Sequence, residues 1–106
     1  MNEQELIKKI TDAQNDIKEG QEILRCFNKN KISEAEEFIE KCQRNIDYSP
    51  FIEINKLASN LAGNLSFKQL QFNQQLKVLD CVILSIKEFL IKISTTKTEN
   101  ERKSKN

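Results

Sequence analysis

Apolar residues recur every three or four positions along most of the chain, which is the spacing of one face of an α-helix. Over residues 3–28 they form a single stripe that consists of Leu6, Ile10, Ala13, Ile17, Leu24 and Phe27. Gly20 lies inside this stripe and leaves two interpretations open. It separates two helices, or it lies within one continuous helix and lowers the stability of that helix by about 1 kcal/mol relative to alanine.

A second helix is predicted after the polar turn at residues 28–31. Ser33 and Glu36 have the spacing of a capping box, in which the two side chains bind free N–H groups at the start of a helix. The apolar residues that follow share one side of the predicted helix: Ala35, Phe38, Ile39, Cys42 and Ile46. Glu37 and Glu40 each precede a basic residue by four positions, which stabilises a solvent-exposed helix face. A site for a cation or a basic partner is the alternative interpretation of this acidic cluster.

The third helix has the clearest predicted boundaries. Ser49 and Pro50 predict an N-cap and a first helical residue, since serine accepts from free N–H groups and proline has no N–H to leave unpaired. Apolar residues then recur at helical spacing: Phe51, Ile54, Leu57, Ala58 and Leu61. Gly63 and Asn64 are residue types that favour the left-handed end of a helix, so we expect the helix to end there.

The last helix has the strongest pattern and is predicted over about residues 67–93. Ser66 and Gln69 form a second capping box at its start. A seam of apolar residues then alternates between spacings of four and three, as in a coiled coil: Phe72, Leu76, Leu79, Ile83, Ile86, Leu90 and Ile93. Further apolar residues widen this face, so we interpret the helix as the central one of a bundle. Charged residues interrupt it too often for a membrane span.

Together these elements predict an all-α protein. Short connections force neighbouring helices to run in opposite directions, so the expected architecture of residues 1–94 is an antiparallel up-down four-helix bundle. Residues 95–106 are all polar, and we expect them to form a disordered, basic C-terminal tail. A chain of 106 residues is long enough for one core, which makes a single bundle domain the expectation.

Composition excludes most catalytic chemistry. The chain has no histidine, two glycines and three cysteines. Nucleophile pairs and zinc sites that need histidine are therefore impossible, and two glycines do not build a phosphate-binding loop. We accordingly expect no enzyme activity, no cofactor and no metal. The cysteines are odd in number and widely spaced, as in reduced cytoplasmic proteins, and the N-terminus lacks the pattern of a signal peptide.

The net charge of +1 is the sum of an acidic first half and a basic second half of the chain. Residues 1–48 carry a net charge of −3, and residues 49–106 carry +4. A nearly neutral chain is a poor match for the phosphate backbone of nucleic acids, so we expect no nucleic-acid partner. The basic second half is instead suited to weak contact with an anionic surface.

Four segments of the second half resemble the immunity proteins of pediocin-like (class IIa) bacteriocins: residues 48–52 (YSPFI), 55–59 (NKLAS), 65–70 (LSFKQL) and 75–79 (QLKVL). In that family a helix opens near a small residue followed by proline, and a short capped link leads to a long last helix. The resemblance implies a cytoplasmic four-helix bundle that protects its producer from the bacteriocin. It also implies that protection occurs at the membrane receptor, the mannose phosphotransferase permease, once the bacteriocin has bound it.

Basic residues of the last helix and the tail are our candidates for partner binding: Lys87, Lys92, Lys97, Arg102, Lys103 and Lys105. Near a membrane, each such charge contributes about 1 kcal/mol of attraction to anionic headgroups, and an acidic loop of the permease is a second target of the same kind. We therefore expect a cytoplasmic monomer that is partly membrane-associated. The alternative function is a small helical adaptor or regulator that binds another protein through the apolar face of the last helix.

Overall fold

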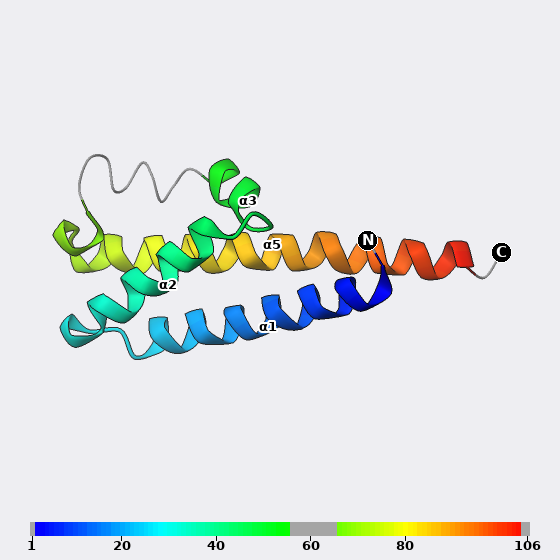
Figure 1. The fold of residues 1–106 in the computed structure, drawn as a ribbon. Coiled ribbons are helices and arrows are strands. Elements are labelled where there is room, and N and C mark those ends of the chain that lie inside the picture. The colour runs from blue at the N-terminus through cyan, green and yellow to red at the C-terminus, as the bar shows by residue number, and fades with distance from the viewer. Residues whose placement is uncertain (1, 56–65, 105–106) are drawn as a thin grey trace.

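The computed structural model of the chain describes residues 2–55 and 66–104, with side chains through residue 96. Every regular element in these residues is helical, which confirms the all-α class. The elements are α1 (Glu3–Arg25), the 3-10 turn η1 (Lys29–Lys31), α2 (Ile32–Arg44), α3 (Ser49–Ile54), the 3-10 turn η2 (Phe67–Gln69) and α5 (Phe72–Ser104). Figure 1 shows α1 and α5 side by side and running in opposite directions, while α2 and α3 also pack against α5.

α1 is one continuous helix, which decides between the two interpretations of Gly20. Its start is capped by Asn2, whose side-chain oxygen accepts a hydrogen bond from Glu5 N at 2.8 Å. Gly20 is buried, and a Cβ atom at this position would lie 2.7 Å from Phe38 Cζ and 2.8 Å from Ile83 Cγ1. The missing side chain therefore lets α1 approach α2 and α5 closely at this point.

The start of α2 differs from the prediction. Ser33 lies inside the helix and no side chain caps its start, so the predicted capping box of Ser33 and Glu36 is wrong. Asn28 acts one turn earlier, because its Oδ1 accepts from Asn30 N at 2.8 Å and opens η1. This 3-10 turn leads directly into α2. Since the turn already orders the chain before Ile32, α2 needs no cap of its own.

The core side of α2 is largely as predicted. Four of its residues are buried: Ala35, Phe38, Ile39 and Cys42. Ile46 is instead 83% exposed, because α2 ends at Arg44 and the backbone of Asn45 is extended. Helical periodicity therefore no longer determines the direction of the Ile46 side chain.

The helix boundary predicted at Ser49 and Pro50 is present but shifted by one residue. Tyr48 is the N-cap and α3 begins at Ser49. Pro50 lies in the first turn, where its missing N–H is tolerated. The described part of α3 ends at Ile54, and the helix end predicted at Gly63 and Asn64 lies outside the described residues.

The second capping box forms, but it opens a shorter element than predicted. Ser66 N donates to Gln69 Oε1 at 2.9 Å, and this box begins η2. The extended backbone of Leu70 then interrupts the helix, so α5 begins at Phe72. Its seam lies at the centre of the core, where four residues are at most 4% exposed: Leu79, Ile83, Ile86 and Ile93.

α5 also extends further than predicted, through Ser104 rather than to about residue 93. The described residues therefore do not confirm a disordered tail that begins at residue 95. Residues 95–104 contain no glycine or proline, and each residue added to an existing helix gains a hydrogen bond without a new nucleation step. The Thr95 hydroxyl donates to the carbonyl oxygen of Ile91 at 2.9 Å, which also fits a continuing helix.

Candidate functional site

Lys87 and Lys92 are the two predicted binding residues whose side chains the structure describes, and both are exposed. They are five positions apart, which rotates a helix by about 140°, so they lie on different faces of α5. Lys92 Nζ lies 5.8 Å from the centroid of the Phe51 ring, a cation–π contact that joins α5 to α3. The structure therefore does not bring these two lysines into one binding surface.

The other candidates lie at or beyond the end of α5. Lys97, Arg102 and Lys103 are on its C-terminal turns, where the backbone alone is described, and Lys105 lies outside the described residues. Figure 1 shows this part of α5 projecting past the start of α1. None of the described helices combines the length and the apolar character that crossing a bilayer requires.

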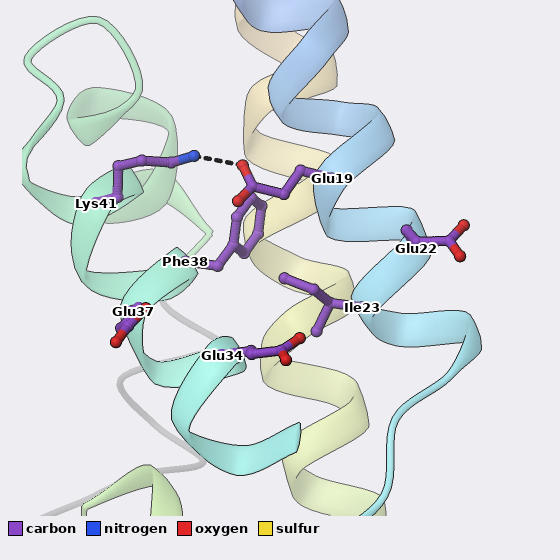
Figure 2. Close-up of a pocket in the computed structure, with 7 residues that line it drawn as sticks. All are labelled: Glu19, Glu22, Ile23, Glu34, Glu37, Phe38 and Lys41. Atoms are coloured by element: carbon purple, nitrogen blue, oxygen red, sulfur yellow. Dashed lines mark hydrogen bonds and ion pairs between the residues drawn. The ribbon is translucent and has the colours of Figure 1, made fainter. Parts of the chain in front are cut away.

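The structure shows a groove between α1 and α2 that sequence reasoning missed (Figure 2). We call it the acidic groove. It has a volume of about 480 Å³ and is lined by Glu19, Glu22, Ile23, Glu34, Glu37, Phe38 and Lys41. Ile23 and Phe38 are buried and supply its apolar part. The lining comes from two different helices, which is why no local sequence pattern revealed it.

Most carboxylates of the acidic groove have a basic partner. Lys41 forms ion pairs across the groove with Glu19 (Figure 2) and with Asp16, the latter at 3.3 Å. Two further pairs are local: Arg25 with Glu22, and Lys31 with Glu34. The predicted pairing of Glu37 with Lys41 does not form, because Lys41 reaches across to α1. These ion pairs make the groove a largely charge-paired surface. Among the described residues, no group of three acidic or cysteine side chains is arranged to hold a metal ion.

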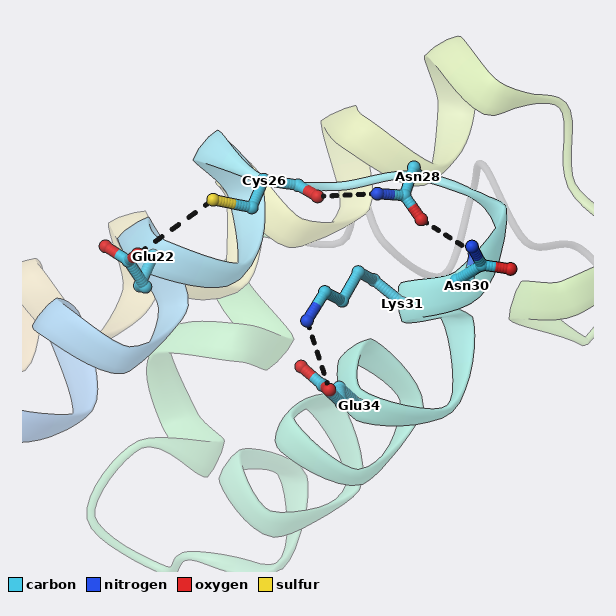
Figure 3. A network of polar contacts seen from close by, with 6 residues as sticks. All are labelled: Glu22, Cys26, Asn28, Asn30, Lys31 and Glu34. Atoms are coloured by element: carbon cyan, nitrogen blue, oxygen red, sulfur yellow. Dashed lines mark hydrogen bonds and ion pairs between the residues drawn. The ribbon is translucent and has the colours of Figure 1, made fainter.

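The connection between α1 and α2 is ordered by polar contacts that continue from the groove (Figure 3). Cys26 Sγ donates to Glu22 Oε1 at 3.9 Å. Asn28 Nδ2 donates to the carbonyl oxygen of Cys26 at 3.2 Å, while Asn28 Oδ1 accepts from Asn30 N. These contacts fix the turn before α2, so we assign them a structural role.

Next to the groove, Asp16 joins α1 to the residue that precedes α3. The Tyr48 hydroxyl donates to Asp16 Oδ2 at 2.5 Å, and Tyr48 is only 2% exposed. Burial and this hydrogen bond raise the pKa of Tyr48 above its usual value. Partial burial lowers the pKa of Lys41, but the hydrogen bonds and charges of Glu19 and Asp16 outweigh this effect and raise it overall. The cluster therefore holds a neutral phenol and a charged ammonium beside one carboxylate.

Cys42 lies close to the same cluster and is fully buried. Burial raises the pKa of its thiol to about 12, and the negative charge of Asp16 adds to the effect. The thiolate is the reactive form of cysteine, so a thiol that stays protonated at neutral pH is a poor nucleophile. Cys42 acts as a small core residue.

These raised pKa values predict a loss of stability in alkaline solution. In the unfolded chain the thiol and the phenol have ordinary pKa values of 9.0 and 10.0, so the unfolded state releases protons first as the pH rises. The stability contribution is fully present below pH 9 and falls above it, by about 1.4 kcal/mol per pH unit for each group that ionises only on unfolding. Urea denaturation between pH 8 and 11 in a reducing buffer measures this loss.

The variants Cys42→Ala and Tyr48→Phe test the cause of the alkaline loss. Each variant lacks one of the two ionising groups, so its stability should decline less steeply between pH 8 and 11 than that of the wild type. Both variants also lose packing or a hydrogen bond at pH 8, which shifts the whole curve without changing its slope. Curves parallel to the wild type would show that neither group drives alkaline unfolding.

Known proteins provide no assignment for this chain, since no protein-family model, no curated protein and no solved structure matches it. The features that bear on a function are the acidic groove, the partly buried Asp16 cluster and the basic C-terminal turns of α5.

Proposed function

We propose that the chain is an immunity protein that protects a bacterial cell from a pediocin-like bacteriocin. The observation that carries the proposal is the order of features in the second half of the chain. A helix start at Ser49 and Pro50 comes first, a capping box at Ser66 and Gln69 follows, and one long last helix comes after it. This is the order that the resemblance of residues 48–79 to that family implies. The helical content of all the described elements also supports it.

The proposal extends to the architecture of the whole chain. We propose an antiparallel up-down four-helix bundle, as the resemblance implies. The antiparallel arrangement of α1 and α5 in Figure 1 supports this architecture. The central position of the α5 seam, in which Leu79 and Ile86 are completely buried, supports it as well.

The proposed contact surface is the basic C-terminal part of the chain. Of the six candidates it includes the four that follow one another at the end of the chain, Lys97, Arg102, Lys103 and Lys105, and not Lys87 and Lys92, which lie on different faces of α5. We propose that these four residues meet anionic headgroups or an acidic loop of the mannose phosphotransferase permease on its cytoplasmic side, once the bacteriocin has bound. Each charge near the headgroups contributes about 1 kcal/mol, so several together hold the protein at the membrane. The action is non-enzymatic, and the protein acts as a cytoplasmic monomer that associates with the membrane.

Expression in a bacteriocin-sensitive strain tests this function. Cells that carry the chain should tolerate a higher concentration of at least one peptide in a panel of pediocin-like bacteriocins than cells with an empty vector. A variant in which Lys97, Arg102 and Lys103 are changed to glutamate should lose this protection, because the contact becomes repulsive. Inhibitory concentrations measure both effects.

A charge-matched variant on α1 is the control for the immunity test. Lys8→Glu, Lys18→Glu, Gln4→Glu and Gln14→Glu change the net charge by the same amount at exposed positions of α1. They leave the C-terminal part of α5 unchanged, and protection should persist in cells that carry them. Unchanged sensitivity to every peptide of a panel that includes the cognate bacteriocin would contradict the proposed function. Equal loss of protection in both sets of variants would contradict the proposed contact surface.

A second candidate function is a helical adaptor or regulator that binds another protein through α5. Leu84 and Ile91 are seven positions apart on one outward face of this helix, and they are 48% and 67% exposed. The adaptor function predicts a stable dimer or a stable complex with a partner. Sedimentation as a monomer at all concentrations, with no partner recovered, would count against it.

A further inference from the structure

A second pocket lies where the connection between α1 and α2 meets the start of α5, and we call it the end pocket. It has a volume of about 480 Å³, and its lining includes Phe27, Ile32, Leu70, Phe72, Lys29 and Lys68. The rings of Phe27 and Phe72 are stacked with their centroids 5.5 Å apart, and Phe67 meets Phe27 edge-on at 6.0 Å. Phe72 is nevertheless 49% exposed, so an aromatic surface is open to a partner.

Uncompensated positive charge accompanies this aromatic surface. Lys29 and Lys68 are both exposed, and neither forms an ion pair within the described residues. Residues 27–32 and 68–75, which supply the lining, contain no aspartate or glutamate. The end pocket thus differs from the acidic groove, where most charged groups already have partners.

We infer that the end pocket binds an acidic segment of a partner protein that inserts a large apolar side chain. A volume of about 480 Å³ falls within the range of pockets that bind ligands. Large side chains that fill such pockets supply much of the binding energy at protein interfaces. Carboxylates beside the inserted side chain would meet Lys29 and Lys68, and this complementarity speeds association and fixes the orientation of the segment.

The shape of the pocket favours a peptide over a lipid surface. A flat bilayer contacts side chains that project from a protein, whereas the Phe72 ring lies stacked on Phe27 at the wall of a cavity. A single side chain of a partner protein can enter this cavity. The inference is also independent of the immunity function, which rests on the C-terminal part of α5.

Binding of synthetic peptides to the full-length chain tests the inference. The probes are peptides in which one phenylalanine, leucine or tryptophan is flanked on both sides by aspartates or glutamates, with lysine-flanked peptides for comparison. In ¹H–¹⁵N spectra of the labelled chain, acidic peptides should shift the amide signals around Phe27 and Phe72. Dissociation constants should lie below about 1 mM, and the lysine-flanked peptides should produce no such shifts.

Two double variants with the same net charge separate the pocket from the overall charge. Lys29→Glu with Lys68→Glu should weaken binding of the acidic peptide about tenfold or more, because attraction becomes repulsion at both positions. Lys8→Glu with Lys18→Glu makes the same charge change on the exposed side of α1, and affinity should change by less than about twofold. Circular dichroism verifies that both variants fold.

Three results would overturn the inference. In the first, no acidic peptide shifts the pocket signals. In the second, the two double variants lose affinity equally, so that net charge alone explains binding. In the third, phosphatidylglycerol vesicles shift the pocket signals and the peptides do not, which assigns the surface to a membrane. Failure to protect cells from a bacteriocin leaves the peptide result intact, so the two proposals fail separately.

Discussion

Replacing Leu79 with alanine should lower the free energy of unfolding by about 2–5 kcal/mol. The Leu79 side chain is 0% exposed and lies in the seam of α5, within the core that α5 shares with α1. Truncation removes apolar atoms from this core and leaves a cavity that two long helices cannot close without losing other contacts. Because small domains are stable by only about 5–15 kcal/mol, the loss is a large fraction of the total. Urea denaturation followed by far-UV circular dichroism measures it.

Leu84→Ala is the matched control for this prediction. It makes the same truncation on the same helix, at a side chain that is 48% exposed. Less apolar surface returns to water and no cavity forms, so the loss should be below about 1 kcal/mol. Similar losses for the two variants would mean that the buried face of α5 has been misidentified.

Helical periodicity predicted most of the buried positions of the long helices, although Phe72, the first residue of the predicted seam, is 49% exposed. A regular helix repeats its direction every 3.6 residues, so the positions of Phe38 and Cys42 in α2, or of Ile83 and Ile86 in α5, follow from the apolar pattern. The same argument fails as soon as the helix ends. Ile46 continues the apolar pattern of α2, but it follows the helix end at Arg44 and is exposed.

Helix ends were harder to predict because more than one nearby side chain can open a helical turn. Ser33 and Glu36 have the spacing of a capping box, yet Asn28 forms the earlier turn and the chain is already helical at Ser33. At Ser66 the box does form, but the extended Leu70 delays α5 until Phe72. Both differences depend on a local choice between 3-10 and α-helical turns that composition does not determine.

The surfaces that suggest binding depend on contacts between distant parts of the chain. The Tyr48 hydroxyl and the Asp16 carboxylate are 32 positions apart, and Lys41 and Glu19 are 22 apart. The end pocket combines residues near Phe27 with residues near Phe72. No periodicity within one helix relates such residues, so the two pockets could not be predicted before the fold was known. The basic residues of α5 could be proposed from the sequence, because they follow one another along the chain.

Substitution of Gly20 should destabilise the protein, although alanine is the better helix former. At an exposed helix position, replacing glycine with alanine adds about 1 kcal/mol of stability. At Gly20 the new Cβ would lie 2.7 Å from Phe38 Cζ and 2.8 Å from Ile83 Cγ1, and both of these side chains are buried. We expect Gly20→Ala to lower the free energy of unfolding by about 1–3 kcal/mol and Gly20→Leu to lower it further, because overpacking forces α1 away from α2 and α5. Urea denaturation measures both losses.

Two further variants test whether close packing is the reason. Asn15→Ala places alanine at an exposed position of α1, where it should raise stability by about 0.5 kcal/mol. Phe38→Leu removes the ring atom nearest to the new Cβ, so Gly20→Ala should destabilise the Phe38→Leu protein less than it destabilises the wild type. The difference between the two losses is the coupling energy of the pair. Equal losses in both backgrounds would show that the Phe38 ring does not limit the approach of α1 to α2, and the need for glycine would then rest on Ile83 alone.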